Sequence, residues 1–124
     1  MLKKTIKDVP AFTAGDDTHL REVLHPKNDP VPLNYSLAHA TLQPGQASLP
    51  HRLLHRSETY IILKGAAVAT VDEQEISLAA GEVLYIPAGA RQSVRNVGAE
   101  VLEFLCIVDP PWAADEEEVL PENG

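Results

Sequence analysis

The sequence predicts a single all-β domain, built as a sandwich or a barrel. Ten prolines and seven glycines are spread through 124 residues, which leaves room for short strands and turns rather than long helices. Short segments rich in β-branched and aromatic residues recur between these turn residues, with no helical periodicity separating them. A chain of this length corresponds to one ordinary domain.

The first 33 residues are irregular, and only residues 18–25 suggest an element there. Leu20, Val23 and Leu24 have the spacing of a helix, whereas the alternation of Leu20, Glu22 and Leu24 suits an edge strand. We interpret the segment as a strand. Residues 1–33 are therefore expected to form an N-terminal arm, with edge strands packed on the barrel.

The strand pattern sharpens after residue 33, and residues 34–112 are expected to form the barrel. The expected strands are 35–42, 59–63, 68–71, 74–78, 83–86, 92–97 and 101–108, most of them ending near a glycine or proline. Asp72 and Glu73 suit the turn of a hairpin. Residues 113–124 form an acidic tail, which is expected to be a solvated face.

Composition excludes several classes of function. The formal net charge of −8 and the lack of a basic stripe argue against binding to nucleic acid. No apolar run reaches the length of a signal peptide or a membrane span. Cys106 is the only cysteine, so no internal disulfide can form. We expect a cytoplasmic protein that binds neither nucleic acid nor membrane.

Two motifs carry the strongest signal. The first places Gly45, His51, Glu58 and Gly65 at fixed offsets, and the second places Gly81, Pro87, Gly89 and Asn96. In these residues the sequence resembles the cupin superfamily. The resemblance implies a double-stranded β-helix, the jelly-roll barrel of the cupins, with a metal site in its interior.

The chain departs from the family pattern at two ligand positions. Leu53 stands where the second histidine of the first motif is expected, and Gln92 where the second motif has its histidine. The resemblance therefore implies a reduced ligand set of His51, Glu58 and Gln92 for one divalent ion, Zn, Ni, Fe or Mn. His55 could swing inward to replace the missing imidazole.

Each candidate ligand also has a plain structural interpretation. His51 could be a hydrogen-bonded interior histidine, and Glu58 could pair with Arg52 or Arg91. Gln92 could hydrogen-bond a ligand or the backbone, and His55 could be an exposed turn residue. A carboxylate aimed into a barrel is costly unless it is paired or bound to metal, which favours a functional role for Glu58.

Other side chains are weighed in the same way. Tyr60 lies two residues after Glu58, so its hydroxyl either lines the pocket or packs in the core. Cys106 is expected to be a buried, inert thiol, and Trp112 to pack against the barrel or a partner subunit. His39 is expected in the core or at an interface. His19 and His25 are expected at the surface.

Two functions remain open. In the first, the metal ion and a small polar or anionic molecule share the interior pocket. If the protein is an enzyme, the resemblance implies a metal-dependent dioxygenase, decarboxylase, or sugar isomerase or epimerase. In the second, a metal-free module binds or senses a small molecule through Glu58, Gln92 and Tyr60. A two-fold homodimer is also expected, with residues 1–30 and Trp112 near its interface.

Overall fold

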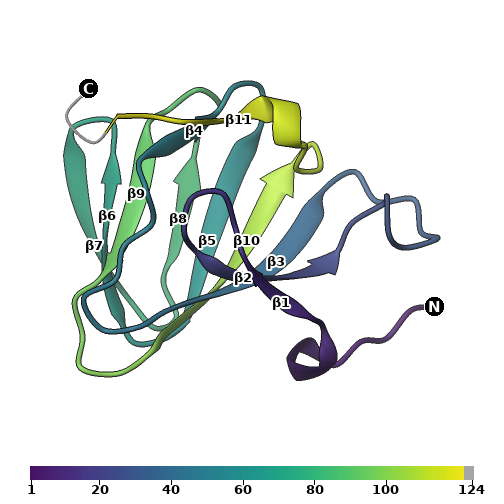
Figure 1. Cartoon of the computed structure of the whole chain (residues 1–124), viewed down its shortest axis with the longest axis horizontal. Coiled ribbons are helices and arrows are strands. Elements are labelled where there is room, and N and C mark those ends of the chain that lie inside the picture. The colour runs from purple at the N-terminus through teal and green to yellow at the C-terminus, as the bar shows by residue number, and fades with distance from the viewer. Residues whose placement is uncertain (122–124) are drawn as a thin grey trace.

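The computed structural model describes residues 1–121 and shows two antiparallel sheets packed as a jelly roll (Figure 1). The first sheet has the order β1 (Ala11–Thr13), β2 (His19–Leu24), β3 (Ser36–Leu42), β10 (Leu102–Asp109), β5 (Ser57–Lys64) and β8 (Val83–Ile86). The second has the order β11 (Glu117–Val119), β4 (His51–Leu53), β9 (Gln92–Asn96), β6 (Ala66–Val71) and β7 (Gln74–Ala79). Two short 3-10 turns, η1 (Ile6–Asp8) and η2 (Ala114–Glu116), complete the regular structure of these residues.

The predicted all-β jelly roll is confirmed. Every strand expected after residue 33 is present, with ends that move by about two residues or fewer. The ambiguous segment at 18–25 is strand β2, because pairing with β3 satisfies its backbone groups. The expected turn at Asp72 and Glu73 joins β6 to β7, with Asp72 at a φ of 54°.

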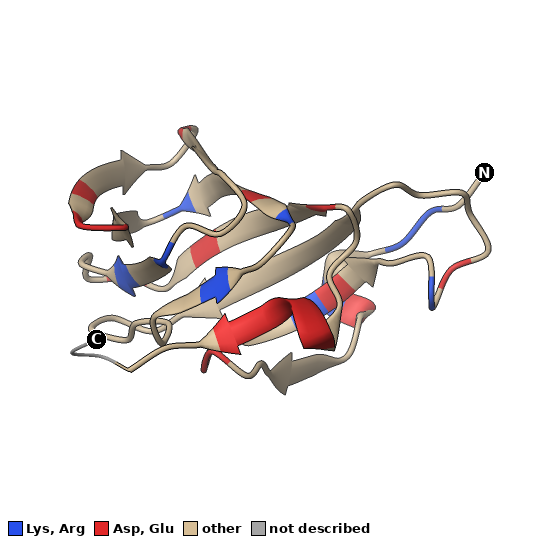
Figure 2. Cartoon of the chain, turned by 90° about the horizontal axis from the view of Figure 1, so that it is seen from above, with Lys and Arg blue, Asp and Glu red and all other residues tan. Residues whose placement is uncertain are grey.

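Both terminal segments add strands to the sheets. In the N-terminal segment, β1 pairs with β2, and β2 covers the edge of β3. In the C-terminal segment, β11 pairs with β4. The acidic residues of this second segment lie on η2 and β11 (Figure 2). The tail is thus partly structured within the described residues, while residues 122–124 of the expected tail lie outside them.

The core lies between the two sheets. Along β5 and β10 every second side chain is buried, which is the alternation of strands with one face inward. Tyr60 and Phe104 pack at the centre, with their ring centroids 5.3 Å apart and the rings tilted by 59°. Cys106, on the same face of β10, is buried as expected.

The motif glycine Gly65 and the motif asparagine Asn96 both have structural reasons. Gly65 has a φ of 93°, and a Cβ there would lie 3.2 Å from the backbone of Leu102. Asn96 is 1% exposed. Its amide nitrogen donates to the carbonyls of Leu42 (2.9 Å) and Glu100 (2.8 Å), and its carbonyl accepts from the Gly98 amide (2.9 Å). This side chain therefore ties β9 to β3 and to the turn before β10.

Among the described residues, no helix is both long and apolar enough to cross a membrane. The expected cytoplasmic location stays a prediction.

Asn96→Ala should lower the free energy of unfolding by about 2–4 kcal/mol, since the change leaves buried backbone partners unsatisfied. Arg95→Ala, at an exposed position of the same strand, is the matched control and should change it by less than about 0.5 kcal/mol. Urea denaturation followed by circular dichroism measures both. Equal effects of the two substitutions would contradict a structural role for the Asn96 amide.

Candidate functional site

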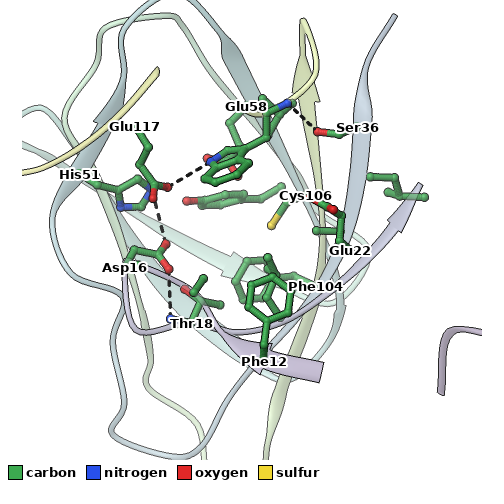
Figure 3. A pocket seen from close by; sticks show the side chains of 18 of the residues that line it. Phe12, Asp16, Thr18, Glu22, Ser36, His51, Glu58, Phe104, Cys106 and Glu117 are labelled. Carbon is green, nitrogen blue, oxygen red and sulfur yellow. Dashed lines mark hydrogen bonds and ion pairs between the residues drawn. The ribbon is translucent and has the colours of Figure 1, made fainter. Parts of the chain in front are cut away.

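A cavity of about 220 Å³ lies between the two sheets (Figure 3). Its polar lining includes Asp16, His51, Glu58, Tyr60, Cys106 and Glu117. Its apolar lining includes Phe12, Leu20, Val94, Phe104, Val108 and Trp112. Most of the wall is apolar, so the few polar groups in it are well placed to orient a bound molecule.

His51 lies on β4, where it is buried at 2% exposure. Its Nδ1 atom lies 2.8 Å from the carbonyl oxygen of Leu49. Because a carbonyl only accepts hydrogen bonds, Nδ1 carries the proton, and Nε2 then presents a lone pair when the ring is neutral. This Nε2 lies 3.6 Å from a carboxylate oxygen of Asp16.

Three potential metal ligands meet at this point. One ligand atom from each of Asp16, His51 and Glu117 lies within 4.8 Å of the other two. Asp16 comes from the turn between β1 and β2, where its carboxylate accepts from the Thr18 amide at 3.1 Å. Its carbonyl accepts from the Leu49 amide at 2.7 Å, which fixes this turn beside the segment that leads into β4.

The third of these ligands, Glu117, arrives from the C-terminal segment. It stands opposite Leu53 in the short ladder between β11 and β4. Its carboxylate lies 3.5 Å from the indole nitrogen of Trp112, which can donate to it. Burial raises the pKa of Glu117, the charge of His51 opposes that rise, and the charge of Asp16 adds to it.

The donor set fits a divalent cation. Two carboxylates and the Nε2 lone pair are all electron-rich, and crowding them together in a partly buried cavity is unfavourable without positive charge between them. A proton on His51 supplies one such charge, and a divalent ion supplies two. Carboxylate oxygens and imidazole nitrogen are also ordinary ligands of divalent metals.

Glu58 lines the same cavity from β5, at 9% exposure. Burial raises the pKa of Glu58 to about 7, the positive charge of His51 opposes this shift, and the charges of Asp16 and Glu117 reinforce it. Glu58 is thus poised between its neutral and ionised forms near neutral pH. That is the property of a group that can accept or donate a proton.

Gln92 connects Tyr60 with His51 and Glu58, two residues of the first motif. It stands directly opposite His51 in the β4–β9 ladder and is 2% exposed. The Tyr60 hydroxyl donates to the Gln92 carbonyl oxygen. A side-chain hydrogen bond from Gln92 also lowers the pKa of Glu58, against the larger effect of burial. The structure therefore brings His51, Glu58 and Gln92 close together with Tyr60, while their role as metal ligands stays a prediction.

His55 lies elsewhere. Its side chain is 77% exposed, and its Nδ1 contacts the carboxylate of Glu116 at 3.2 Å. The backbone amide of His55 donates to the same carboxylate at 2.9 Å. This arrangement matches the alternative of an exposed turn residue, and the side chains that lie close to His51 are instead Asp16 and Glu117.

Two of the three grouped side chains are not predicted from the sequence. Asp16 lies in the irregular first 33 residues, and Glu117 lies in the acidic tail. No spacing rule connects either residue to the motifs, because both are delivered by the chain ends. The one available signal was that the motifs lack two of the family's histidines, while the segments on either side of them contain an aspartate and a glutamate.

The expectation that His25 is a surface residue is wrong. His25 is 6% exposed, and its Nε2 lies 2.7 Å from the carbonyl of the cavity-lining Trp112. The amide of Trp112 donates to the Ser36 hydroxyl at 2.9 Å. Lys27 places its ammonium 5.5 Å from the centroid of the indole and 3.3 Å from Glu22. The position of Trp112 is therefore fixed by hydrogen bonds between its backbone and the side chains of His25 and Ser36.

Comparison with known proteins places the chain in context. Residues 38–108 match the sequence profile of the Cupin domain. The uncharacterized protein MJ1618 of Methanocaldococcus jannaschii is 29% identical over 120 residues, covering 97% of this chain and 95% of that protein. The mannose-1-phosphate guanylyltransferase of Salmonella montevideo is 25% identical over 94% of this chain, which spans only 26% of the enzyme.

A solved structure of similar fold is a variant of PAC13 from Streptomyces with uridine. Its TM-score is 0.79 at 16% identity, covering 98% of this chain and 92% of the other. At that identity the likeness concerns the fold.

Glu58→Gln should stabilise the metal-free protein, increasingly so as the pH rises. The native Glu58 pKa of about 7 lies above its ordinary value of 4.5, so the folded state holds the proton more tightly than the unfolded state. The cost of ionising Glu58 is therefore absent below pH ~4.5, grows up to about pH 7 and then levels off at roughly 3 kcal/mol. The amide variant avoids this cost.

The measurement is urea denaturation of both proteins in chelator across this pH range. Glu73→Gln, at the exposed β6–β7 turn, is the control and should show no such trend. A difference between Glu58→Gln and native protein that is flat with pH would refute the raised pKa. A strongly destabilised variant at pH 8 would show that Glu58 needs its charge.

Proposed function

The chain belongs to the cupin family, and we propose that its interior cavity binds one divalent metal ion together with a small molecule. The proposed metal ligands are Asp16, His51 and Glu117. The observation that carries the proposal is their mutual approach to within 4.8 Å from three separate segments. The remaining coordination positions would face the cavity, which is where a small molecule would bind.

The ligand chemistry favours some ions over others. Two carboxylates and one imidazole form a harder set than the family's histidine-rich site. Of Zn, Ni, Fe and Mn, this set shifts preference toward Mn and Fe and away from Ni, relative to a three-histidine site. When bound, such an ion supplies Lewis-acid chemistry.

The chain's own residues have distinct roles in this proposal. Glu58 holds or releases a proton near neutral pH, because burial raises its pKa to about 7. Gln92 positions Tyr60 and Glu58 through hydrogen bonds. The apolar wall excludes water from the bound molecule, which strengthens every polar contact inside. The PAC13 structure with uridine supports the small-molecule half of the proposal, since a protein of the same fold is described with one.

A metal-free binding module is the second candidate, favoured by the hydrogen bonding of Tyr60, Gln92 and Glu58. A Glu58 that is largely protonated below pH 7 needs no cation. His51 could then be charged and paired with Asp16 at 3.6 Å, so the cavity would bind a small molecule by hydrogen bonds alone. The two candidates differ in whether purified protein holds a stoichiometric ion.

Asp16→Asn and Glu117→Gln should each abolish stoichiometric metal binding, because each removes one of three ligands. Elemental analysis after loading with Mn²⁺ or Zn²⁺ and gel filtration measures the content. Asp17→Asn and Asp115→Asn are matched controls, with the same charge change at exposed neighbouring positions. They should keep full metal content.

The melting temperature gives a second readout of this prediction. Metal should raise the melting temperature of native protein and of both controls, and leave the two ligand variants unchanged. Native protein that holds no ion under any loading condition would refute the metal proposal and support the metal-free module. If Glu58→Gln lost the metal and Asp16→Asn kept it, the ligands would be those of the motifs, His51, Glu58 and Gln92, and not Asp16.

A two-fold homodimer is a further part of the proposal. Exposed apolar side chains support it on the N-terminal arm, where Leu2 and Phe12 are 42% and 48% exposed. They also support it on the outer face of the six-stranded sheet, where Val83 and Tyr85 are 60% and 64% exposed. Trp112 was expected near the dimer interface, and it lines the cavity.

Light scattering should give about twice the chain mass of 13.5 kDa at micromolar concentration. Leu2→Lys and Tyr85→Lys, compared with native protein, identify which surface is used. The one that yields monomer marks the interface, because a charge in a buried apolar contact is strongly unfavourable. A native mass near 13.5 kDa would contradict the homodimer.

A further inference from the structure

The aromatic residues of this chain are concentrated at one place. The sequence holds one tryptophan, two phenylalanines and three tyrosines. The tryptophan, both phenylalanines and one tyrosine line the cavity: Trp112, Phe12, Phe104 and Tyr60. The two other tyrosines, Tyr35 and Tyr85, are exposed. A general need for core volume would distribute these rings through the core, so their clustering points to the contents of the cavity.

The rings come from four different segments and occupy two levels. Tyr60 and Phe104, from β5 and β10, are 2% and 1% exposed and pack against each other. Phe12, from the edge strand β1, is 48% exposed although it lines the cavity. Figure 3 shows Phe12 beside Phe104, with Asp16, His51 and Glu117 on another side of the space.

Trp112 lies outside regular structure, but hydrogen bonds fix its position. Both its amide and its carbonyl are bonded by side chains, Ser36 at 2.9 Å and His25 at 2.7 Å. Its indole nitrogen reaches the ligand candidate Glu117 at 3.5 Å. The indole thus contacts the Glu117 carboxylate through its ring nitrogen and carries the Lys27 ammonium over its face, 5.5 Å from the ring centroid.

We propose that the small molecule is a planar aromatic or heteroaromatic carboxylate of about ten non-hydrogen atoms. The cavity of about 220 Å³ corresponds to roughly seven water volumes, which is enough for one ring with a short substituent. Offset and edge-to-face contacts with Trp112 and the phenylalanines favour a flat π-system over a saturated ring of equal size.

The sign of the ligand charge rests on the proposed metal. With a divalent ion bound, the charges of Asp16 and Glu117 are neutralised, and an anionic oxygen is a good further ligand. Of the described residues that line the cavity, only Lys27 carries a fixed positive charge, and it lies over the Trp112 ring. Without the ion, the carboxylates would favour an aromatic amine instead.

The test compares benzoate with cyclohexanecarboxylate, which have the same number of non-hydrogen atoms and the same charge. Titration calorimetry on Mn²⁺-loaded protein should show benzoate binding at least about fivefold more tightly. Trp112 is the only tryptophan, so benzoate should also change the protein's fluorescence. Trp112→Leu and Phe12→Leu should each lower the affinity ratio toward one, while Tyr85→Leu, an exposed ring outside the cavity, should leave it unchanged.

Different outcomes would overturn the aromatic carboxylate ligand and the metal site. Metal-loaded protein that binds both acids equally, or neither at millimolar concentration, overturns the inference and leaves the metal site intact. Protein that takes up no metal refutes the metal proposal, and benzylamine against cyclohexylmethylamine then tests the ring alone. A preference for benzylamine in that state keeps ring recognition and overturns the carboxylate, and no preference overturns both.

Discussion

The interior of this jelly roll has to balance several carboxylates against one imidazole. Asp16 and Glu117 approach His51, and Glu58 lies in the same cavity. Burial raises the pKa of both Glu58 and Glu117, which records the electrostatic cost of holding these charges together. The folded chain can meet this cost by keeping protons or by binding a cation.

The segments that supply Asp16 and Glu117 lie at the edges of the two sheets. Asp16 is in the turn between the two N-terminal strands, and Glu117 is on a three-residue strand that pairs only with β4. The second of these is held in part by two ion pairs, the exposed Arg52 with Glu118 at 3.1 Å and the more buried Arg56 with Glu116 at 2.7 Å. An exposed pair such as the first contributes little stability. A cation shared by Asp16 and Glu117 would join the two ends of the chain across the cavity, so occupancy and order of these segments are expected to be linked.

The sequence was sufficient to predict the fold and the proximity of His51, Glu58 and Gln92, because both depend on local patterns. Strand alternation and turn residues predicted the sheets, and the motif offsets placed His51, Glu58 and Gln92 at one location, where the structure has them. The contributions of Asp16, Glu117 and His25 could not be predicted in this way. Each depends on a contact between segments far apart in sequence: the β1–β2 turn with the approach to β4, β11 with β4, and His25 with the carbonyl of Trp112. A carboxylate in a turn or an acidic tail has the same local pattern whether it faces solvent or a cavity.

The two departures from the family motif, Leu53 and Gln92, occur together with two carboxylates that the terminal segments bring to His51. With Leu53 apolar and Gln92 engaged by the Tyr60 hydroxyl, the imidazoles that would have faced an ion from β4 and β9 are missing. Asp16 and Glu117 lie near His51 instead, and Glu117 stands opposite Leu53 in the β11–β4 ladder, so the group around His51 is more anionic than a set of histidines. Gln92 then acts as a neutral support for Tyr60 and Glu58. A site altered in this way retains the cupin architecture while changing its charge, and charge decides which ions and which ligands a buried cavity can bind.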